Sequence, residues 1–330
     1  MISTLPQPEL RHLRRELLAW FDAHRRDLPW RTDRDPYRVW VSEIMLQQTR
    51  VAAVVDHYGR FMKRFPTVEV LASAREQSVL AAWSGLGYYH RARRMHQAAK
   101  IIVRERGGHF PSRAEEWLGL PGIGRYTAAA IASIAFGEPL AVVDGNVRRV
   151  LERLSGWVAQ NGTGWEQAEA LLDRKRPGDF NQAMMELGAM ICTPRAPQCL
   201  SCPLKTWCST RGEQALRPQE ARKRRQLFYA WVQRGDAVLL VQRPTDARRM
   251  ANMWELPPLE SSPDGTASPV ARLRHSITDT DYEVLVFPAA PTDVTKSRWF
   301  TPQQWQRLAL TGLARKILRR LASPGPEVRA

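Results

Sequence analysis

The sequence predicts a mainly α-helical domain that carries a metal-binding cysteine loop and is followed by a smaller α+β domain. Apolar residues recur at helical spacing from residue 9 to about residue 190, all four cysteines lie in residues 192–208, and alternating apolar residues begin near residue 227. Because 330 residues exceed the usual size of one domain, we expect two folded units. Their predicted ranges are 1–220 for the helical domain, 221–227 for a basic linker and 228–330 for the α+β domain.

The helical prediction begins with an amphipathic stretch at residues 9–26. Its apolar side chains recur on one stripe, at Leu10, Leu13, Leu17 and Phe21. From there to residue 190, short breaks that contain Pro or Gly separate further helical stretches, and alternating strand patterns are scarce. The first two thirds of the chain is therefore predicted to be all-α.

The α+β prediction comes from a change of pattern after the basic run at residues 222–225, which suits an exposed linker. Residues 227–232 and 237–241 alternate as two strands around an Arg-Gly-Asp turn, which is a hairpin signal. Residues 282–287 predict another strand, and residues 305–321 predict a helix.

The charge balance favours a polyanionic partner. The chain has 49 Lys and Arg against 33 Asp and Glu, a net charge of +16, and nucleic acid is the commonest biological polyanion. A generally basic proteome would give the same excess. No apolar run approaches the roughly 20 residues that span a membrane, and the first residues lack an apolar signal core. We therefore expect a cytoplasmic protein of bacterial type, which would associate with the nucleoid if its polyanionic partner is DNA. The oligomeric state stays open, and a monomer is the simpler expectation.

The four cysteines follow the spacing Cys192-x6-Cys199-x2-Cys202-x5-Cys208. Clustering every thiol within 17 residues is hard to explain by packing. Four thiolates can hold a [4Fe–4S] cluster or a tetrahedral zinc ion. Zinc sites usually pair two short knuckles, whereas only one Cys-x2-Cys occurs here, so the spacing favours iron–sulfur modestly and leaves zinc open.

A glycine-containing turn precedes an alanine-rich helical stretch at residues 120–127, which read Leu-Pro-Gly-Ile-Gly-Arg-Tyr-Thr. Gly122 and Gly124 would allow a tight turn that presents backbone N–H groups, and the start of the next helix adds positive potential. Such an arrangement binds a DNA phosphate without base preference. An ordinary connection between two helices is the alternative interpretation.

Two carboxylates could cleave a glycosidic bond, because one can protonate the leaving group and the other can stabilise a cationic sugar. Glu43 lies among apolar residues, where burial would raise its pKa and keep it protonated. The polar face of an amphipathic helix is the alternative for Glu43. Asp144 precedes a helical stretch and suits an N-cap, which would hold the carboxylate rigid, ionised and low in pKa.

Three further sequence strings resemble those of a known protein family. They are Trp-Val-Ser-Glu-Ile-Met-Leu-Gln-Gln-Thr, Gly-Leu-Gly-Tyr-Tyr-x-Arg-Ala-Arg and Val-Asp-Gly-Asn-Val-Arg-Arg-Val. Together with the cysteine spacing and the turn at Gly122, they resemble the helix-hairpin-helix, or endonuclease III, superfamily of DNA glycosylases. Within that superfamily they resemble the MutY family of adenine DNA glycosylases, densely over residues 9–225.

The resemblance implies that the enzyme removes adenine mispaired with 8-oxoguanine or guanine from double-stranded DNA. It assigns a [4Fe–4S] cluster to the four cysteines, with a structural and DNA-docking role. Glu43 would protonate adenine, Asp144 would stabilise the oxocarbenium ion, and Asn146 would orient the site.

Tyr126 stands where strand-nicking relatives carry a lysine nucleophile. A phenol cannot form a Schiff base, so the resemblance implies a monofunctional glycosylase without efficient strand cleavage.

Further positions carried over from the family fill or line the space of an extruded base. Gln48 and Tyr88 match residues that wedge into the DNA at the lesion, and Gly85 and Gly87 predict an exposed loop around Tyr88. The adenine-pocket positions are Leu28, Trp30 and Gln182, and Arg31 is the neighbouring DNA contact.

The last domain resembles a Nudix domain in its strings at residues 238–244 and 254–257. It lacks the Arg-Glu-x-x-Glu-Glu helix that binds Mg²⁺, so hydrolysis of nucleotides is not expected. The resemblance implies recognition of 8-oxoguanine. Thr278 retains a hydroxyl for this contact, but Asp279 replaces the histidine that the family often has, which makes the preference for 8-oxoguanine less secure.

Three other functions are compatible with part of this sequence. An endonuclease III-like lyase is disfavoured by Tyr126 and by the extra domain. A DNA-binding protein with structural zinc and no activity would lack the absorbance near 400 nm of a brown iron–sulfur protein. A hydrolase of free nucleotides is disfavoured by the missing carboxylates.

Overall fold

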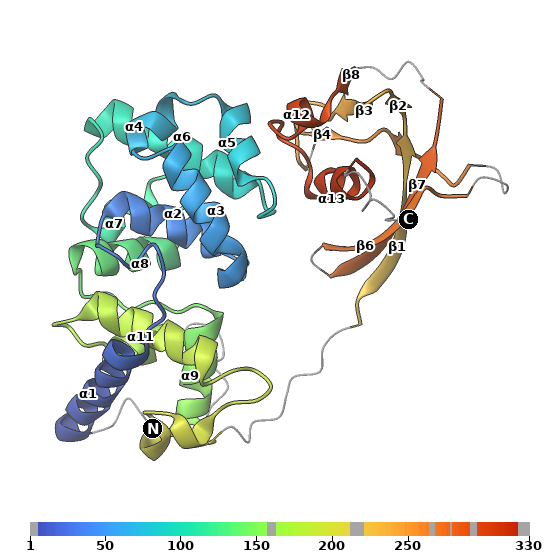
Figure 1. The fold of residues 1–330 in the computed structure, drawn as a ribbon. Coiled ribbons are helices and arrows are strands. Elements are labelled where there is room, and N and C mark those ends of the chain that lie inside the picture. Colours follow the sequence, from blue (N-terminus) through green and yellow to red (C-terminus); the bar gives the residue numbers. More distant parts are fainter. Residues whose placement is uncertain are drawn as a thin grey trace, which may run out of the picture. The chain divides into compact units, whose positions relative to one another are not determined.

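The structure is a computed structural model that describes residues 6–156, 163–211, 221–247, 249–263, 268–277, 279–290 and 296–322. The chain divides into two compact units (Figure 1). The first unit comprises Met1–Ala72 and Gln97–Pro218, and the second comprises Ser73–His96 and Gln219–Ala330. A short helical segment from the first third of the sequence therefore belongs with the C-terminal strands.

The first unit is helical, as the amphipathic pattern predicts. Its elements are α1 (Gln7–His24), α2 (Pro36–Leu46), α3 (Val51–Arg64), α4 (Val68–Ser73), the later turns of α6 (His90–Arg106), α7 (Ala114–Leu118), α8 (Arg125–Phe136), α9 (Gly145–Ser155), α10 (Thr163–Leu171), α11 (Pro177–Met190) and two short 3₁₀ helices at Cys199–Ser201 and Lys205–Trp207. Helices α1, α9, α10 and α11 share a buried apolar core that the cysteine loop covers at one end.

Helix α2 is the central helix of the site. Asp35 caps its N-terminus by accepting from Arg38 N at 2.9 Å, and Pro36 occupies the first helical position, where its missing N–H costs no helical bond. Apolar residues surround this helix, and it packs on α8 and α3. A helix that is apolar on all sides is buried, so any polar side chain on it is enclosed as well.

The second unit is α+β. Helix α5 (Glu76–Trp83) and the first turns of α6 accompany two sheets and two C-terminal helices. One sheet has the strand order β5-β1-β7-β6, and in the other β3 pairs with β2, β4 and β8. The strands are β1 (Lys223–Trp231), β2 (Gln233–Arg234), β3 (Ala237–Gln242), β4 (Trp254–Glu255), β5 (Pro258–Leu259), β6 (Ala271–Ile277), β7 (Thr280–Pro288) and β8 (Ser297–Phe300), and the helices are α12 (Pro302–Trp305) and α13 (Gly312–Leu321).

Two segments of the second unit differ from the prediction. Residues 223–227, expected in a linker, form the first half of β1, because their backbone pairs in parallel with β7 while the basic side chains stay exposed. The helix expected over residues 305–321 is interrupted. Trp254 N donates to Ala309 O, Thr311 N donates to Trp254 O, and the Thr311 side chain then caps α13.

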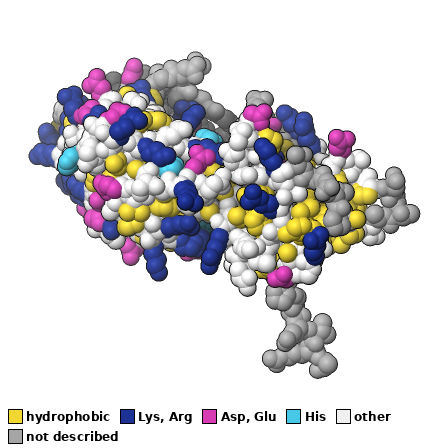
Figure 2. Space-filling view, turned by 90° about the horizontal axis from the view of Figure 1, so that it is seen from above, with side chains coloured by type: hydrophobic (Ala, Val, Ile, Leu, Met, Phe, Trp, Pro, Cys, Tyr) yellow, Lys and Arg dark blue, Asp and Glu magenta, His cyan; other side chains and the backbone are white. Residues whose placement is uncertain are grey.

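The charge excess is visible on the surface. The face in Figure 2 carries more Lys and Arg than Asp and Glu side chains, in keeping with the net charge of +16. Within the described residues, every helix is too short or too polar to cross a membrane.

Candidate active site

Glu43 is a buried carboxyl on α2 with 6% of its surface exposed. This placement excludes the polar helix face that the sequence left open. Tyr126, in the first turn of α8, donates its hydroxyl to Glu43 Oε2 at 3.0 Å. Burial raises the pKa of Glu43 to about 7, which the negative charge of Asp144 supports and the Tyr126 hydrogen bond opposes. The carboxyl therefore holds its proton near neutral pH.

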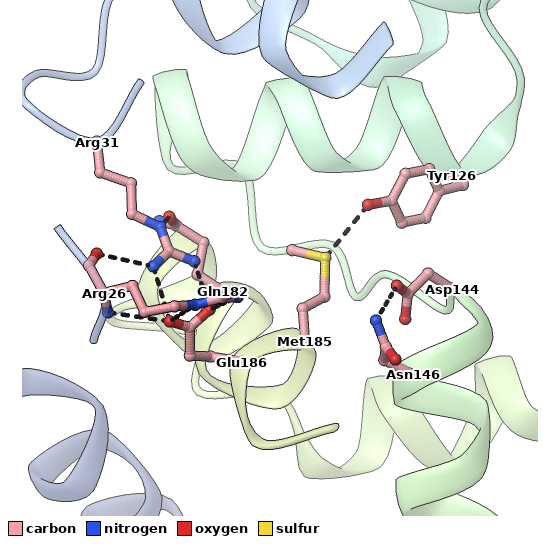
Figure 3. Close-up of polar contacts among 8 residues, drawn as sticks. All are labelled: Arg26, Arg31, Tyr126, Asp144, Asn146, Gln182, Met185 and Glu186. Atoms are coloured by element: carbon pink, nitrogen blue, oxygen red, sulfur yellow. Dashed lines mark hydrogen bonds and ion pairs between the residues drawn. The ribbon is translucent and has the colours of Figure 1, made fainter. Parts of the chain in front are cut away.

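Asp144 is the N-cap of α9, as predicted, and is held from two sides. Its Oδ1 accepts from Val147 N at 2.7 Å and its Oδ2 accepts from Asn146 Nδ2 at 3.2 Å (Figure 3). The predicted direction of its pKa was wrong, because burial raises the pKa of Asp144 despite these bonds. The charge of Asp144 also raises the pKa values of Glu43 and Tyr126, so the three groups form one electrostatic site.

A second buried glutamate lies on α11, and sequence analysis missed it. Glu186, 1% exposed, is paired with Arg26 at 2.7 Å and with Arg31 at 3.0 Å. Burial would raise the pKa of Glu186, but the hydrogen bonds from the two guanidinium groups lower it to about 2. The available signal was a glutamate among the apolar residues of the second half of α11, and its partners lie about 160 positions away in sequence.

Arg31, predicted as a DNA contact, and Gln182, predicted for the adenine pocket, meet at this ion pair. Arg31 Nε donates to Gln182 Oε1 at 3.0 Å, while its other nitrogens contact Glu186 (Figure 3). The Arg31 side chain is only 12% exposed, so it belongs with the pocket side chains rather than with a surface that contacts phosphates. Its positive charge lowers the pKa of Glu43, which links this cluster to the first one.

Met185 of α11 contacts the site around Glu43 and directly precedes Glu186, the centre of the ion pairs. Its sulfur accepts from the Tyr126 hydroxyl at 3.2 Å, and its neighbour in sequence is Glu186 (Figure 3). The remaining pocket positions, Leu28 and Trp30, are each 6% exposed, and the Trp30 ring meets Tyr58 edge-on. Helix α11 thus supplies side chains both to the site around Glu43 and to the ion pairs of Glu186.

A hydrogen-bonded path leads from Asp144 to the cysteine loop. Asn146 donates to Asp144, and Arg149 Nη2 donates to Asn146 Oδ1 at 2.8 Å. Arg149 Nε donates to Cys192 O at 2.8 Å. A Cβ built at Gly188 of α11 would lie 2.7 Å from Asn146 Cβ, so the close approach of α9 and α11 requires glycine.

The four cysteines line one small cavity together with Arg153, Lys205 and Arg211. Arg153 is 5% exposed, and its Nη1 lies 3.3 Å from Cys192 Sγ. Among the described residues, no three His, Cys, Asp or Glu side chains are arranged around one point that could hold a single metal ion. Four thiols that line one cavity could ligate a metal cluster together, and the buried Arg153 guanidinium beside them would offset the negative charge of the thiolates.

The predicted DNA-contact residues of the first unit lie at element ends. Gly122 has φ of 82°, which favours glycine, and Gly124 precedes α8 with open space around it. The exposed Gln48 has φ of 54°, which is rare for a residue with a side chain, and the preceding Gln47 donates to Thr127 Oγ1 at 3.1 Å. Rare backbone conformations concentrate at functional sites.

The second unit carries the other predicted contacts. Tyr88 has φ of 47° and is 37% exposed. Thr278 lies outside the described residues. The adjacent Asp279 is exposed. The hydrogen bond from the Thr280 hydroxyl lowers the pKa of Asp279, and the ion pair with Lys223 lowers it further.

Comparison with known proteins gives consistent matches. Residues 41–175 match the family described as HhH-GPD superfamily base excision DNA repair protein. The chain is 52% identical over 210 residues to an adenine DNA glycosylase of Rattus norvegicus, which aligns 59% of this chain and 41% of the relative. It is 50% identical over 218 residues to one of Homo sapiens, with coverages of 62% and 40%. The chain thus spans about two fifths of the length of these relatives.

Solved structures match the helical part. A thermostable thymine-DNA glycosylase aligns with a TM-score of 0.58 and 31% identity, over 63% of this chain and 98% of that chain. An endonuclease III trapped on DNA aligns with a TM-score of 0.55 and 24% identity, over 64% and 99%, and shows the shared fold.

Proposed function

Because this chain belongs to the HhH-GPD superfamily of base excision DNA repair proteins, we propose that it is a monofunctional adenine DNA glycosylase. The observation that carries the proposal is the pair of carboxyl groups at Glu43 and Asp144, which share one electrostatic site but have different hydrogen-bond donors, a phenol for Glu43 and a backbone N–H and an amide for Asp144. The names of the relatives that are about half identical over the aligned region support adenine as the base.

In the proposed reaction, Glu43 is the acid that protonates the extruded adenine. A carboxyl with a pKa of about 7 can still carry the proton at neutral pH, and the leaving group departs more easily once protonated. Tyr126 donates to the same carboxyl and keeps it oriented. As the bond between the sugar C1′ and adenine breaks, the proton stays with adenine and Glu43 becomes a carboxylate. A water molecule then adds to the cationic C1′ and gives up a proton, which restores the acid form of Glu43.

Asp144 would face the cationic sugar. Val147 N and Asn146 Nδ2 hold its two oxygens, so little rearrangement is needed when charge develops in the transition state. Tyr126 occupies the position of the lyase lysine, and its phenol forms no imine, which supports base removal without strand cleavage.

The remaining assignments are part of the same proposal. Gly122 and Gly124 would bind phosphate, Gln48 and Tyr88 would occupy the gap left by the base, and Leu28, Trp30 and Gln182 would enclose adenine. The C-terminal domain would be Nudix-like and would recognise 8-oxoguanine through residues around Thr278. The partner is double-stranded DNA that carries adenine opposite 8-oxoguanine or guanine.

Cys192, Cys199, Cys202 and Cys208 would hold a [4Fe–4S] cluster, which when bound supplies a rigid anionic crosslink of the loop. The cavity that the four thiols line, and the Arg153 guanidinium beside it, support this assignment. The role of Arg153 would be to offset the charge of the thiolates. An absorbance band near 400 nm in the purified protein tests the cluster.

The activity test uses four duplexes, with A opposite 8-oxoguanine, A opposite G, A opposite T, and T opposite G. The full chain is incubated with each duplex in single turnover, and abasic sites are then cleaved with alkali. We expect product from the first two duplexes only. Product from T opposite G alone would instead indicate the activity named for the thymine-DNA glycosylase match.

Glu43→Gln should lower the excision rate by roughly 10²–10⁴-fold while DNA binding persists, because the amide keeps the shape but loses the acid proton. Glu16→Gln in α1, whose side chain is 44% exposed, is the matched control. A Glu43→Gln variant that excises adenine at the unaltered rate would disprove the assignment.

A further inference from the structure

The loop that carries Tyr88 has an unusual backbone. Gly85 and Gly87 have φ of 111° and 71°, and Tyr88 follows with φ of 47°. Side-chain-bearing residues seldom adopt this left-handed conformation, so the surroundings must impose it. The exposed position of Tyr88 therefore depends on contacts that hold both sides of the loop.

The inner contact is made by Arg91, which is 5% exposed. Its Nη2 donates to Leu86 O and to Gly87 O, both at 3.3 Å. Its guanidinium lies 5.4 Å from the Trp83 ring centre and 5.3 Å from that of Tyr88. Cation–π contacts at these distances are favourable, so Arg91 stabilises the position of the Tyr88 ring.

The outer contact comes from the C-terminal part of the chain. The Leu310 carbonyl accepts from Tyr89 OH at 3.0 Å and from Ser84 Oγ at 3.2 Å. Ser84 precedes the loop and Tyr89 ends it, and they are 7% and 5% exposed. One backbone oxygen therefore ties together both ends of the six-residue loop. Arg315 Nε also donates to Ser84 Oγ, at 2.8 Å.

Leu310 can offer this oxygen because the chain is not helical there. The interruption before α13 turns residues 309–311 towards β4, and the hydrogen bonds of Trp254 with Ala309 and Thr311 fix the segment. Two more contacts of the same kind support the arrangement. Gln77 Nε2 donates to Asn252 O at 3.1 Å, and Arg93 Nη2 donates to Ala251 O.

We propose that the Leu310 carbonyl, through Ser84 and Tyr89, positions the Tyr88 loop for insertion into DNA, so that the C-terminal part of the chain controls the wedge. Ser84, Tyr89 and Arg315 are positioning residues, because none of them has to touch the DNA itself. This inference rests on the proposed role of Tyr88 in the glycosylase reaction.

The test measures base unstacking directly. The probe is a duplex with A opposite 8-oxoguanine and 2-aminopurine as the neighbouring base, whose fluorescence rises when it loses its stacking partner. Full-chain proteins in a Glu43→Gln background are used at saturating concentration, so the signal does not depend on excision. The variants are Tyr89→Phe, Ser84→Ala and the double variant, with Tyr229→Phe in β1 as the matched control.

We expect the double variant to lose most of the fluorescence rise, although it stays folded at the assay temperature and binds DNA with an affinity close to that of the control. In the background with Glu43 intact, single-turnover excision should slow by about tenfold, since removal of a buried hydrogen bond has effects of this order. Arg315→Gln, which removes the guanidinium that donates to Ser84 Oγ and to Leu308 O but leaves both hydroxyl contacts to Leu310 O, should give a smaller loss. It serves as the test variant if the double variant folds poorly.

Fluorescence equal to that of the control in both the double variant and Arg315→Gln would overturn the proposal, as would a probe that does not respond to the parent protein. If the parent protein unstacks the probe but the Glu43-containing enzyme releases no adenine, the glycosylase proposal fails while the positioning role stands.

Discussion

Two buried glutamates of the helical unit have opposite protonation behaviour. Glu43 and Glu186 are 6% and 1% exposed, yet the pKa of Glu43 is raised to about 7 and that of Glu186 is lowered to about 2. Glu43 has a phenol as its hydrogen-bond partner, whereas Glu186 has two guanidinium groups. Burial alone therefore does not decide which glutamate is an acid and which is an anchor, and the identity of the partners does.

The largest effect should follow from removing the anchor. Glu186→Ala leaves Arg26 and Arg31 without their shared anion, and breaking such a buried pair costs roughly 3–5 kcal/mol of unfolding free energy. Urea unfolding of the variant beside an exposed control, Glu105→Ala, measures this difference. A change below about 1 kcal/mol would mean that solvent screens the cluster well, as at a surface ion pair.

The same comparison predicts opposite dependences of stability on pH. The folded pKa of Glu43 lies above its unfolded value, so the folded state binds the extra proton and stability is lost as the pH rises from about 4.5 to about 7. Glu43→Gln should therefore stabilise the protein at pH 8 by roughly 2–3 kcal/mol relative to its effect at pH 4.5.

For Glu186 the folded pKa lies below the unfolded value. Its contribution is therefore present above about pH 4.5 and is lost as the pH falls towards about 2. Unfolding curves at several pH values distinguish the two residues. Equal effects of Glu43→Gln at pH 4.5 and pH 8 would contradict the raised pKa.

A smaller effect is expected from a substitution at Gly188, where α11 lies close to Asn146 of α9. In Gly188→Ala the new methyl group would meet Asn146, and crowding of this kind costs typically 1–3 kcal/mol. Because Asn146 holds Asp144, excision should slow by more than the loss of stability explains. Gly59→Ala, where nothing lies within 4 Å, is the control for single-turnover rates. Equal rates in both variants would separate Asn146 from the reaction.

The smallest effect is expected from removing the Tyr126 hydroxyl. The Tyr126 hydrogen bond lowers the pKa of Glu43, so Tyr126→Phe should raise it further and move the alkaline fall in excision rate to higher pH. Loss of one such bond corresponds to about 1 kcal/mol, or slightly under one pH unit. A pH–rate profile measures the displacement. Movement of the profile towards lower pH would contradict this direction.

Sequence reasoning reached much of the site but not its electrostatics. The N-cap at Asp144 follows from local spacing and is confirmed, whereas its raised pKa depends on how deeply the folded chain buries it. Glu186 was not predicted as a site residue, because its partners Arg26 and Arg31 lie in a distant segment of the sequence. The roles of Gln48, Tyr88 and Thr278 remain predictions that come from family resemblance.

The fold was predictable to a similar degree. Helical periodicity identified the first unit, and alternation identified β1, β3 and β7 of the second, because both patterns are local. The interruption at residues 308–311 was not visible, since β4 imposes it through backbone hydrogen bonds that carry no sequence signature. The inclusion of residues 73–96 in the second unit likewise depends on tertiary contacts.

The tie at Leu310 bears on how the protein should be dissected. A fragment that ends before β1 keeps every carboxylate of the candidate site but exposes the hydroxyls of Ser84 and Tyr89 to water. Slow catalysis by such a fragment would then report a less restrained loop as well as the loss of the proposed recognition of the opposite base. The thymine-DNA glycosylase match aligns over nearly its whole length with only 63% of this chain, so shorter relatives of this kind are natural comparisons for how such a loop is otherwise restrained.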